Sequence, residues 1–359
     1  NIYTDTDGKR YFVWGSFWQG IQCAPLNADG TIKGIDCFAT GAASDSNNAV
    51  MLSKSQNFGN AIMSVKSGVF GPEGPWMISN PDTGYRYLFT SYGWLGTNYN
   101  IRIARSSLDT SMENVISSGS TTEFLDQKGN QVGRAYSAGS KEELTGYKMI
   151  GSYKFDDGIT YYGNGHNSVL NDSGDWYLVD HMRKVADAIA YLQVRKMLWT
   201  KSGWPVVSPV GYTGEKVQKL DKTMLYGTWD LASVGHTILK DGVTNIGSCS
   251  SRDADLPVES SEIVLMPNGR LAYDLGTWSF DGDHTVTITF TKDGDNSKNQ
   301  YFKNGDVLEM YALVGYDEDD AAHTVVMTGI DQNTVTQFAK KSNANASDTR
   351  PIVQTPTAT

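Results

Sequence analysis

Glu73 is the residue whose surroundings point most directly to chemistry. It lies in the stretch Gly71-Pro-Glu-Gly-Pro-Trp76, where two prolines and two glycines predict a backbone that is both bent and stiff. Trp76 can supply an apolar wall, and such a wall disfavours the charged form of a carboxylic acid. An acid that keeps its proton near neutral pH can act as a general acid toward a sugar leaving group. The competing interpretation is a solvent-exposed turn residue.

A second candidate is His166, which lies between glycines in Gly163-Asn-Gly-His-Asn-Ser168. A histidine held in this way at the entrance of a strand can direct a ring nitrogen toward a central cavity. It could equally be a histidine in a surface turn. The segment lacks the multiple His or Cys ligands of a zinc site, so the sequence argues against zinc.

Aromatic side chains on glycine-bounded turns are candidates for stacking on sugar rings. Trp18 occurs in Gly15-Ser-Phe-Trp-Gln-Gly20, and Tyr92 and Trp94 occur just beyond a strand in Ser91-Tyr-Gly-Trp-Leu95. Each ring could instead be buried in a core.

Short aromatic or β-branched runs next to Gly turns predict the antiparallel hairpins that would position these residues. Functional-looking loops, Gly turns and strand pairs recur in the same order roughly 70–90 residues apart, which favours the blades of a β-propeller. One stretch, from Arg183 to about Arg195, has a helical pattern, with Val185, Ile189 and Leu192 on one side. The strand runs include residues 10–15, 85–92, 100–105 and 175–180.

The sequence predicts a division into four parts. Residues 1–215 form the propeller segment, 216–223 a polar linker, 224–341 a second all-β unit and 342–359 a polar tail rich in Ser, Thr, Pro, Ala and Asn. In the second unit Gly-Thr-Trp recurs at 227–229 and 276–278, and alternating runs lie at 284–290, 325–329 and 334–338. An up-and-down barrel of about eight strands would accommodate this pattern.

Composition limits the classes of partner. The net charge is −10 and no Lys/Arg block occurs, which argues against nucleic acid or an anionic membrane. The 9 Trp, 19 Tyr and 37 Gly suit a β-rich protein that stacks on sugars. No phosphate-binding Gly loop or Gly-x-Ser-x-Gly motif supports a kinase or an α/β-hydrolase. Cys23 and Cys37 flank the turn at 27–30 and could either form a disulfide or remain free thiols.

Taken together, several sequence motifs resemble those of glycoside hydrolase family 43, and within it the arabinanase branch. Residues 224–341 resemble the β-barrel accessory domain that follows the propeller in larger members. The matching words are Asn1-Ile-Tyr3, Asp7-Gly8, Gly15-Ser-Phe-Trp18, Glu73-Gly-Pro75, Tyr87-Leu-Phe-Thr-Ser-Tyr-Gly93, Tyr99-Asn-Ile-Arg-Ile-Ala-Arg-Ser106, Gly165-His-Asn-Ser168 and Gly203-Trp-Pro-Val-Val-Ser-Pro209.

The resemblance implies an all-β fold: a five-bladed β-propeller, incomplete in this chain, followed by a lipocalin-like barrel. It also implies an inverting hydrolase of α-1,5-linked arabinan, in which an acid and a base lie on opposite faces of the sugar. Glu73 matches the general acid. His166 matches the histidine that helps hold a calcium ion, largely through waters. The implied substrate-binding residues are Ser16, Trp18, Tyr92, Trp94, Asn100, Asn167 and Ser168.

The chain departs from the family pattern at its start. In the family, an Asp that tunes the acid precedes the strand that resembles Asn1-Ile-Tyr3, and the base lies further upstream. Asp5, Asp7 and Asp172 are rejected as substitutes because each lies in a turn sequence, where Asp is common for local reasons. We therefore expect the N-terminal part of the propeller to be a separate or cleaved chain that stays docked.

The sequence leaves several questions of function open. The chain could be a family 43 xylosidase or arabinofuranosidase, or a non-catalytic carbohydrate-binding fragment. The barrel could bind sugar or only buttress the propeller, and cleavage could be endo or exo. A polymeric partner such as arabinan, or its oligosaccharides, predicts a secreted or cell-surface location.

Overall fold

The computed structural model describes residues 1–16, 20–33, 60–63, 72–117, 124–127, 129, 131–132, 146–156, 158–186, 188–215, 219–234, 257–318 and 321–342. The chain divides into two compact units. The first contains Asn1–Tyr92 and Arg102–Tyr147, and the second contains Gly93–Ile101 and Lys148–Thr359. Among the described residues, no helix is both long and apolar enough to cross a membrane.

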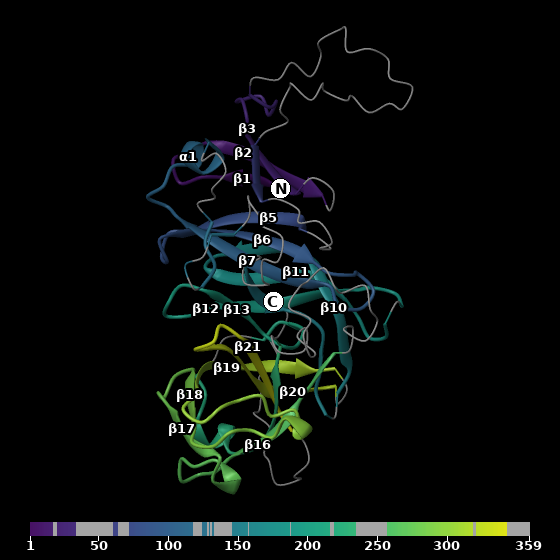
Figure 1. Ribbon diagram of the computed structural model, residues 1–359, viewed down its shortest axis with the longest axis vertical. Helices are drawn as coiled ribbons and strands as arrows, with labels where there is room; N and C mark the ends of the chain where they lie inside the picture. The colour runs from purple at the N-terminus through teal and green to yellow at the C-terminus, as the bar shows by residue number, and fades with distance from the viewer. Residues whose placement is uncertain are drawn as a thin grey trace, which may run out of the picture. The chain divides into compact units, whose positions relative to one another are not determined.

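Two four-stranded sheets contain the strands of the first part of the chain (Figure 1). The first has the order β1-β2-β3-β4, with β1 at Ile2–Thr4, β2 at Arg10–Ser16, β3 at Gly20–Pro25 and β4 at Asn60–Met63. The second has the order β5-β6-β7-β8, with β5 at Glu73–Asn80, β6 at Tyr85–Tyr92, β7 at Asn100–Ser107 and β8 at Tyr147–Ile150. The short helix α1 spans Met112–Ser117. Neighbours in sequence are neighbours in each sheet, as in a propeller blade.

A buried ion pair joins two segments within the first unit. Arg86 of β6 donates from Nη2 to both carboxylate oxygens of Asp5, each at 3.1 Å, and both side chains are almost fully buried. Tyr3 also donates to Asp5 Oδ1 at 2.6 Å. Asp5 is therefore committed to holding the strands together. Its rejection as a catalytic base agrees with this position.

A third sheet lies in the second unit and contains a five-stranded antiparallel meander, β9 to β13. Its order is β13-β12-β11-β10-β9-β15, with β9 at Tyr153–Lys154, β10 at Thr160–Asp172, β11 at Asp175–Arg183, β12 at Tyr191–Trp199, β13 at Pro205–Val207 and β15 at Val258–Glu259. At its centre Arg195 is fully buried, and its guanidinium reaches Asp180, Asn164 and Tyr153.

The prediction of a helix from Arg183 to about Arg195 is wrong, because this segment is the connection and strand of the β11–β12 hairpin. Val185, Ile189 and Leu192 have the spacing of one helical face, but their exposed fractions are 63%, 75% and 75%. No core covers them, so the burial that normally stabilises an amphipathic helix is missing. Cross-strand pairing of the hairpin determines the structure instead.

The region predicted as a barrel, residues 224–341, contains a seven-stranded antiparallel sheet curved into a nearly closed barrel. Its order is β16-β14-β21-β20-β19-β18-β17, with β14 at Gly227–Ser233, β16 at Ser261–Leu265, β17 at Gly276–Phe280, β18 at Thr285–Phe290, β19 at Val307–Asp317, β20 at Ala322–Asp331 and β21 at Thr336–Lys341. Three short 3-10 helices, Lys222–Leu225, Ala272–Asp274 and Asn296–Lys298, accompany it. The predicted barrel is confirmed, with seven strands in the described residues where the sequence suggested about eight.

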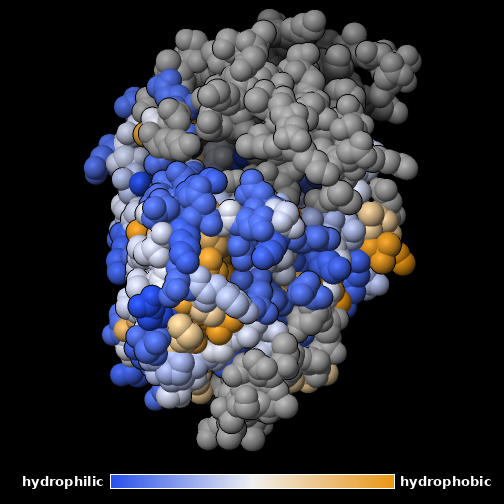
Figure 2. Space-filling model, turned by 60° about the horizontal axis from the view of Figure 1, so that its bottom comes forward, coloured by the Kyte–Doolittle hydropathy of each residue, from blue (hydrophilic) through white to orange (hydrophobic). Residues whose placement is uncertain are grey.

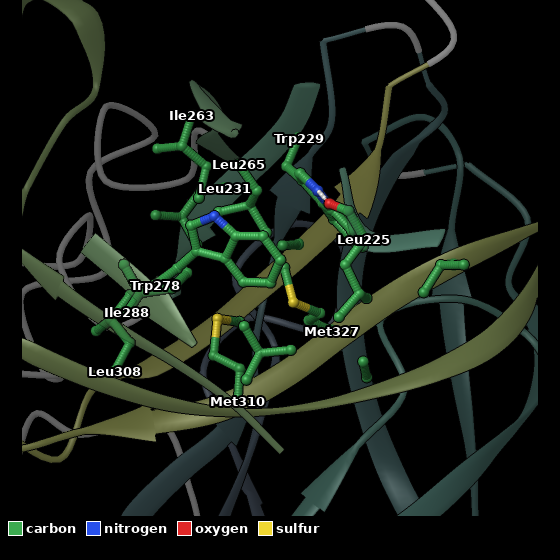
Figure 3. Close-up of a cluster of buried hydrophobic side chains, with 14 of the residues drawn as sticks. Leu225, Trp229, Leu231, Ile263, Leu265, Trp278, Ile288, Leu308, Met310 and Met327 are labelled. Atoms are coloured by element: carbon green, nitrogen blue, oxygen red, sulfur yellow. Dashed lines mark hydrogen bonds between the residues drawn. The ribbon is translucent and has the colours of Figure 1, made fainter. Parts of the chain in front are cut away.

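Large side chains fill the interior of the barrel (Figure 3). Trp229 and Trp278 lie among Leu, Ile and Met side chains, and the Trp229 indole donates to Leu225 O at 2.9 Å. Leu220, within the predicted linker, is also buried in this core. The two Gly-Thr-Trp repeats thus place an indole from β14 and another from β17 inside the barrel.

The third sheet, which we call the last blade, and the barrel are joined within the second compact unit. Strand β15, which precedes the barrel strand β16, pairs in parallel with β9, so that Val258 lies opposite Tyr153. The ring of Tyr153 packs edge-on against Phe338 of β21 at 5.0 Å. The residues that are coloured by hydropathy in Figure 2 are mostly hydrophilic, with small separate hydrophobic areas.

Candidate functional site

Glu73 is the first residue of β5 and lies beside an irregularity in the strand. The pairing register with β6 shifts between Glu73 and Trp76, and Gly74 between them has a φ of 56°. Glycine adopts this left-handed conformation without the steric cost that a side chain adds. Glu73 pairs with the buried Ser91, and both Glu73 and Trp76 are half-buried. The proline- and glycine-rich segment thus ends in a bulged strand, and the carboxylate lies at the entrance of that strand.

His166 lies on β10, where the strand is also irregular. The register with β11 shifts on both sides of Gly165, and His166 has a φ of 52° with an exposed side chain. Gly165 is required by packing, because a Cβ at this position would lie 1.9 Å from Cδ1 of Tyr99. The glycines that frame His166 therefore allow a bulge that leaves the imidazole exposed, while Gly165 itself packs tightly against Tyr99.

His181 is a functional candidate that the sequence reasoning missed. It pairs with Gly165 across β10 and β11, and its ring is stacked with Tyr99 at 5.6 Å and with His166 at 6.5 Å. Burial, together with the charges of Arg183 and His166, lowers the pKa of His181 to about 4. The imidazole is therefore neutral at pH 7. Its place just beyond the predicted strand at 175–180 gave no motif that would single it out.

Two asparagines on β10 differ sharply in how their amides are satisfied. The Asn164 amide is fully engaged, donating to Gly151 O at 2.7 Å and accepting from Arg195 Nη2 at 3.0 Å. Asn167 is only 5% exposed, yet neither its Nδ2 nor its Oδ1 has a hydrogen-bond partner among the described residues. Buried amides are almost always paired, so such an exception calls for an explanation. A bound polar ligand would supply one.

The remaining predicted substrate-binding residues fall into different environments. Trp94 is 48% exposed, and the turn that carries it is closed by its backbone N–H donating to Asn98 Oδ1 at 2.5 Å. Asn100 is buried and donates to Asn98 O at 3.0 Å. Ser168 is half-buried and pairs with Val179.

Tyr92 is a core residue of the first unit. Its ring is 1% exposed, and its hydroxyl donates to Met63 Sδ at 3.2 Å. A ring so deeply buried offers no face for stacking on a sugar. Trp18 lies outside the described residues, and so does the side chain of Ser16, the last residue of β2.

The donor groups near His166 bear on the calcium prediction. The described residues contain no group of three or more His, Cys, Asp or Glu side chains that could hold a metal ion. Calcium prefers six to eight oxygen ligands. The described residues therefore do not fit a calcium ion bound directly by protein carboxylates, and His166 could contribute only one ligand among waters.

Asp7, Asp172 and Cys23, which the sequence analysis also singled out, belong to no metal-binding group among the described residues. Asp7 and Asp172 lie exposed at hairpin turns, as the sequence indicated. Cys23 is a free, buried thiol on β3, and burial raises its pKa to about 12. Cys37 lies outside the described residues.

Comparison with known proteins agrees with this architecture. Residues 209–339 match the family model of the GH43_C domain, described as a C-terminal lipocalin-like domain. The chain is 29% identical over 299 residues to an extracellular endo-α-(1→5)-L-arabinanase of Bacillus subtilis, covering 80% of this chain and 55% of the relative. It is 27% identical over 251 residues to a similar enzyme of Thermotoga petrophila, covering 66% and 46%. The chain thus spans about half the length of these relatives.

Solved structures share the fold. A crystal structure of a glycoside hydrolase family 43 protein from Bacillus licheniformis matches with a TM-score of 0.70 and 23% identity, covering 96% of this chain and 67% of that one. The endo-1,5-α-L-arabinanase of Thermotoga petrophila matches with a TM-score of 0.69 and 21% identity over the same shares. The predicted resemblance is confirmed: the chain is similar to family 43 arabinanases, and residues 209–339 match the model of the C-terminal lipocalin-like domain.

Proposed function

We propose that this chain is the C-terminal, larger part of an inverting glycoside hydrolase that cleaves α-1,5-linked arabinan. The observation that carries the proposal is Asn167, a buried amide without a partner among the described residues, next to the outward-turned His166. An amide with both a free donor and a free acceptor matches the hydroxyl groups of a sugar. The similarity to endo-arabinanases supports arabinan as that sugar.

In the proposed mechanism, Glu73 transfers a proton, and Asn167 and Trp94 bind the sugar. Glu73 is the general acid that protonates the departing glycosidic oxygen, and Trp76, half-buried on the same strand, is the residue that the sequence suggested as its apolar wall. Asn167 orients hydroxyl groups of the arabinofuranose ring. Trp94, with 48% of its side chain exposed, can stack on a sugar face. An inverting reaction also needs a carboxylate base on the opposite face of the sugar.

That base and the tuning Asp belong, in this proposal, to the N-terminal portion of the propeller, present as part of a longer protein or as a docked chain. The family resemblance supports this assignment, since it places both groups ahead of the strand that begins this chain. Calcium at His166 stays part of the proposal as a largely water-bound ion that would shape the local electric field. Relatives named extracellular support secretion or a cell-surface location.

The general-acid role is tested with the complete protein, including its N-terminal portion, and linear arabinan as substrate. Glu73→Gln should lower turnover by at least about two orders of magnitude, because it removes the transferable proton while keeping the shape of the side chain. Glu113→Gln is the matched control in the same unit, since Glu113 is an exposed residue of α1 paired with Lys9. Equal activity of the two variants would remove Glu73 from the mechanism.

Substrate class is tested in the same assay. Release of arabino-oligosaccharides from linear arabinan, without release of xylose from xylan or aryl xylosides, separates an arabinanase from a family 43 xylosidase. Binding of arabinan without any new reducing ends, even with the N-terminal portion present, would instead identify a carbohydrate-binding fragment. Intact masses recorded on the same sample show whether the N-terminal portion is a separate chain.

A further inference from the structure

A cavity lies on the outside of the barrel, between strand β12 of the last blade, the segment 208–215 that follows β13, and strand β19 of the barrel. We call it the seam pocket and define it by Lys196, Leu198, Trp199, Tyr212, Glu215 and Tyr311. Its volume is about 130 Å³, close to that of a protein cavity that holds a benzene ring. All its lining residues belong to the second compact unit. The barrel interior is filled with side chains (Figure 3), whereas the seam pocket leaves space for a ligand on the outside of the barrel.

Three aromatic side chains form walls of the seam pocket, and their neighbours hold them in place. Trp199 packs edge-on against Trp176 at 5.3 Å, and Tyr212 packs against Tyr177 at 4.9 Å. The Tyr311 hydroxyl donates to Glu309 and accepts from the backbone N–H of Lys201. Because these rings are fixed in the free protein, a ligand meets preformed apolar faces and little ordering entropy is lost on binding.

The charged groups of the seam pocket are opposite in sign and each has a partner. Lys196 is buried, and its Nζ lies 2.6 Å from Asp175 Oδ1. Glu215 is also buried, accepts from the backbone N–H of Thr213 at 2.9 Å and lies 3.4 Å from His323 Nε2. The seam pocket therefore has no excess charge that would select an anion or a cation. Neutral ligands with hydroxyl groups can still use the remaining hydrogen-bonding capacity of these groups.

We propose that the seam pocket binds one neutral sugar unit of an arabinan chain, as an anchoring site separate from the catalytic residues. Aromatic walls with a few polar groups at fixed positions are the usual composition of a small-ligand site, and the size suits a single ring. The choice of arabinose rests on the proposed function, whereas the choice of a neutral polyhydroxyl ligand rests on the seam pocket itself. The barrel then contributes to substrate binding as well as supporting the last blade.

The test uses a reporter inside the seam pocket. The chain is labelled with 5-fluorotryptophan, and the Trp199 resonance is assigned by its absence in Trp199→Phe. Titration with linear arabinotriose should shift this resonance in a saturable manner. Tyr212→Ala, which removes one wall, should weaken the apparent affinity at least about fivefold, and Leu198→Trp, which fills the seam pocket, should abolish the shift. Tyr191→Ala is the control on the same strand, because Tyr191 is 48% exposed and does not line the seam pocket.

The outcomes separate this inference from the proposed function. No saturable shift with arabinotriose, a shift with xylotriose only, or a shift that survives both Tyr212→Ala and Leu198→Trp overturns the inference. A shift of Trp199 in a complete protein that does not hydrolyse arabinan supports the sugar site and contradicts the proposed function. Hydrolysis of arabinan without any shift of the Trp199 resonance supports the proposed function and overturns the sugar site in the seam pocket.

Discussion

The unpaired amide of Asn167 leads to an unusual prediction: replacing a buried residue should stabilise the free protein. An unsatisfied buried polar group costs about 1–3 kcal/mol, and neither amide atom of Asn167 has a partner among the described residues. Asn167→Leu removes both polar atoms and keeps the same number and branching of side-chain heavy atoms. We expect the free energy of unfolding in the absence of sugar to rise by about 1–3 kcal/mol, while the affinity for arabino-oligosaccharides falls.

Asn164 on the same strand is the matched control. It is fully buried like Asn167, but its amide donates to Gly151 O and accepts from the buried Arg195. Asn164→Leu leaves a donor of the charged guanidinium unpaired, so it should destabilise the protein by about 3 kcal/mol. Urea unfolding of both variants and the parent, with and without arabinotriose, measures both effects. Destabilisation by Asn167→Leu of the same size as by Asn164→Leu would refute the argument, because it would show that the Asn167 amide is already satisfied in the free protein.

Two further predictions concern charged and titrating groups. The pKa of His181 is lowered to about 4 from 6.5, so the unfolded state binds the extra proton first and stability should fall as the pH drops from about 6.5 to 4. After allowing for solvent screening of a partly exposed ring, we expect about 1–2 kcal/mol of this loss of stability to disappear in His181→Gln. Urea unfolding between pH 4 and 6.5 measures the effect. If the free energy of unfolding of His181→Gln depends on pH as in the parent protein, His181 is not the source of the loss. Asp5→Ala leaves Arg86 buried without its carboxylate and should destabilise the protein by about 3–5 kcal/mol. Asp7→Ala, at an exposed pair with Lys9, should cause no measurable change in the free energy of unfolding. Equal effects of the two substitutions would show that the buried pair stabilises the protein no more than the exposed one.

The sequence predicted elements that depend on local alternation and missed features that depend on pairing between strands. The runs at 85–92 and 175–180 became β6 and β11 because aromatic and β-branched runs next to Gly turns favour strands. The spacing of apolar residues also suggested a helix at 183–195, but no core covers these apolar side chains in the structure. Local pattern cannot report whether a face will be buried.

The candidate site shows the same limit. The motif around His166 was visible because glycines mark the bulge, and Asn167 could be named from the family resemblance. His181 was not, since only the β10–β11 register brings its ring next to Tyr99. The burial of Tyr92 against Met63 was equally invisible, because those residues are 29 positions apart. The seam pocket joins residues from 196 to 315, which no local motif connects.

The parallel pairing of β15 with β9 has a consequence for where this molecule can be divided. The segment at 216–223 has the composition of a domain boundary, yet the chain returns after β14 to add a strand to the blade sheet before continuing the barrel. Cutting at that boundary would remove a strand from one half and leave β9 with an unprotected edge, a template for aggregation. A barrel transferred to another protein would therefore carry with it a strand that belongs to the sheet of the blade.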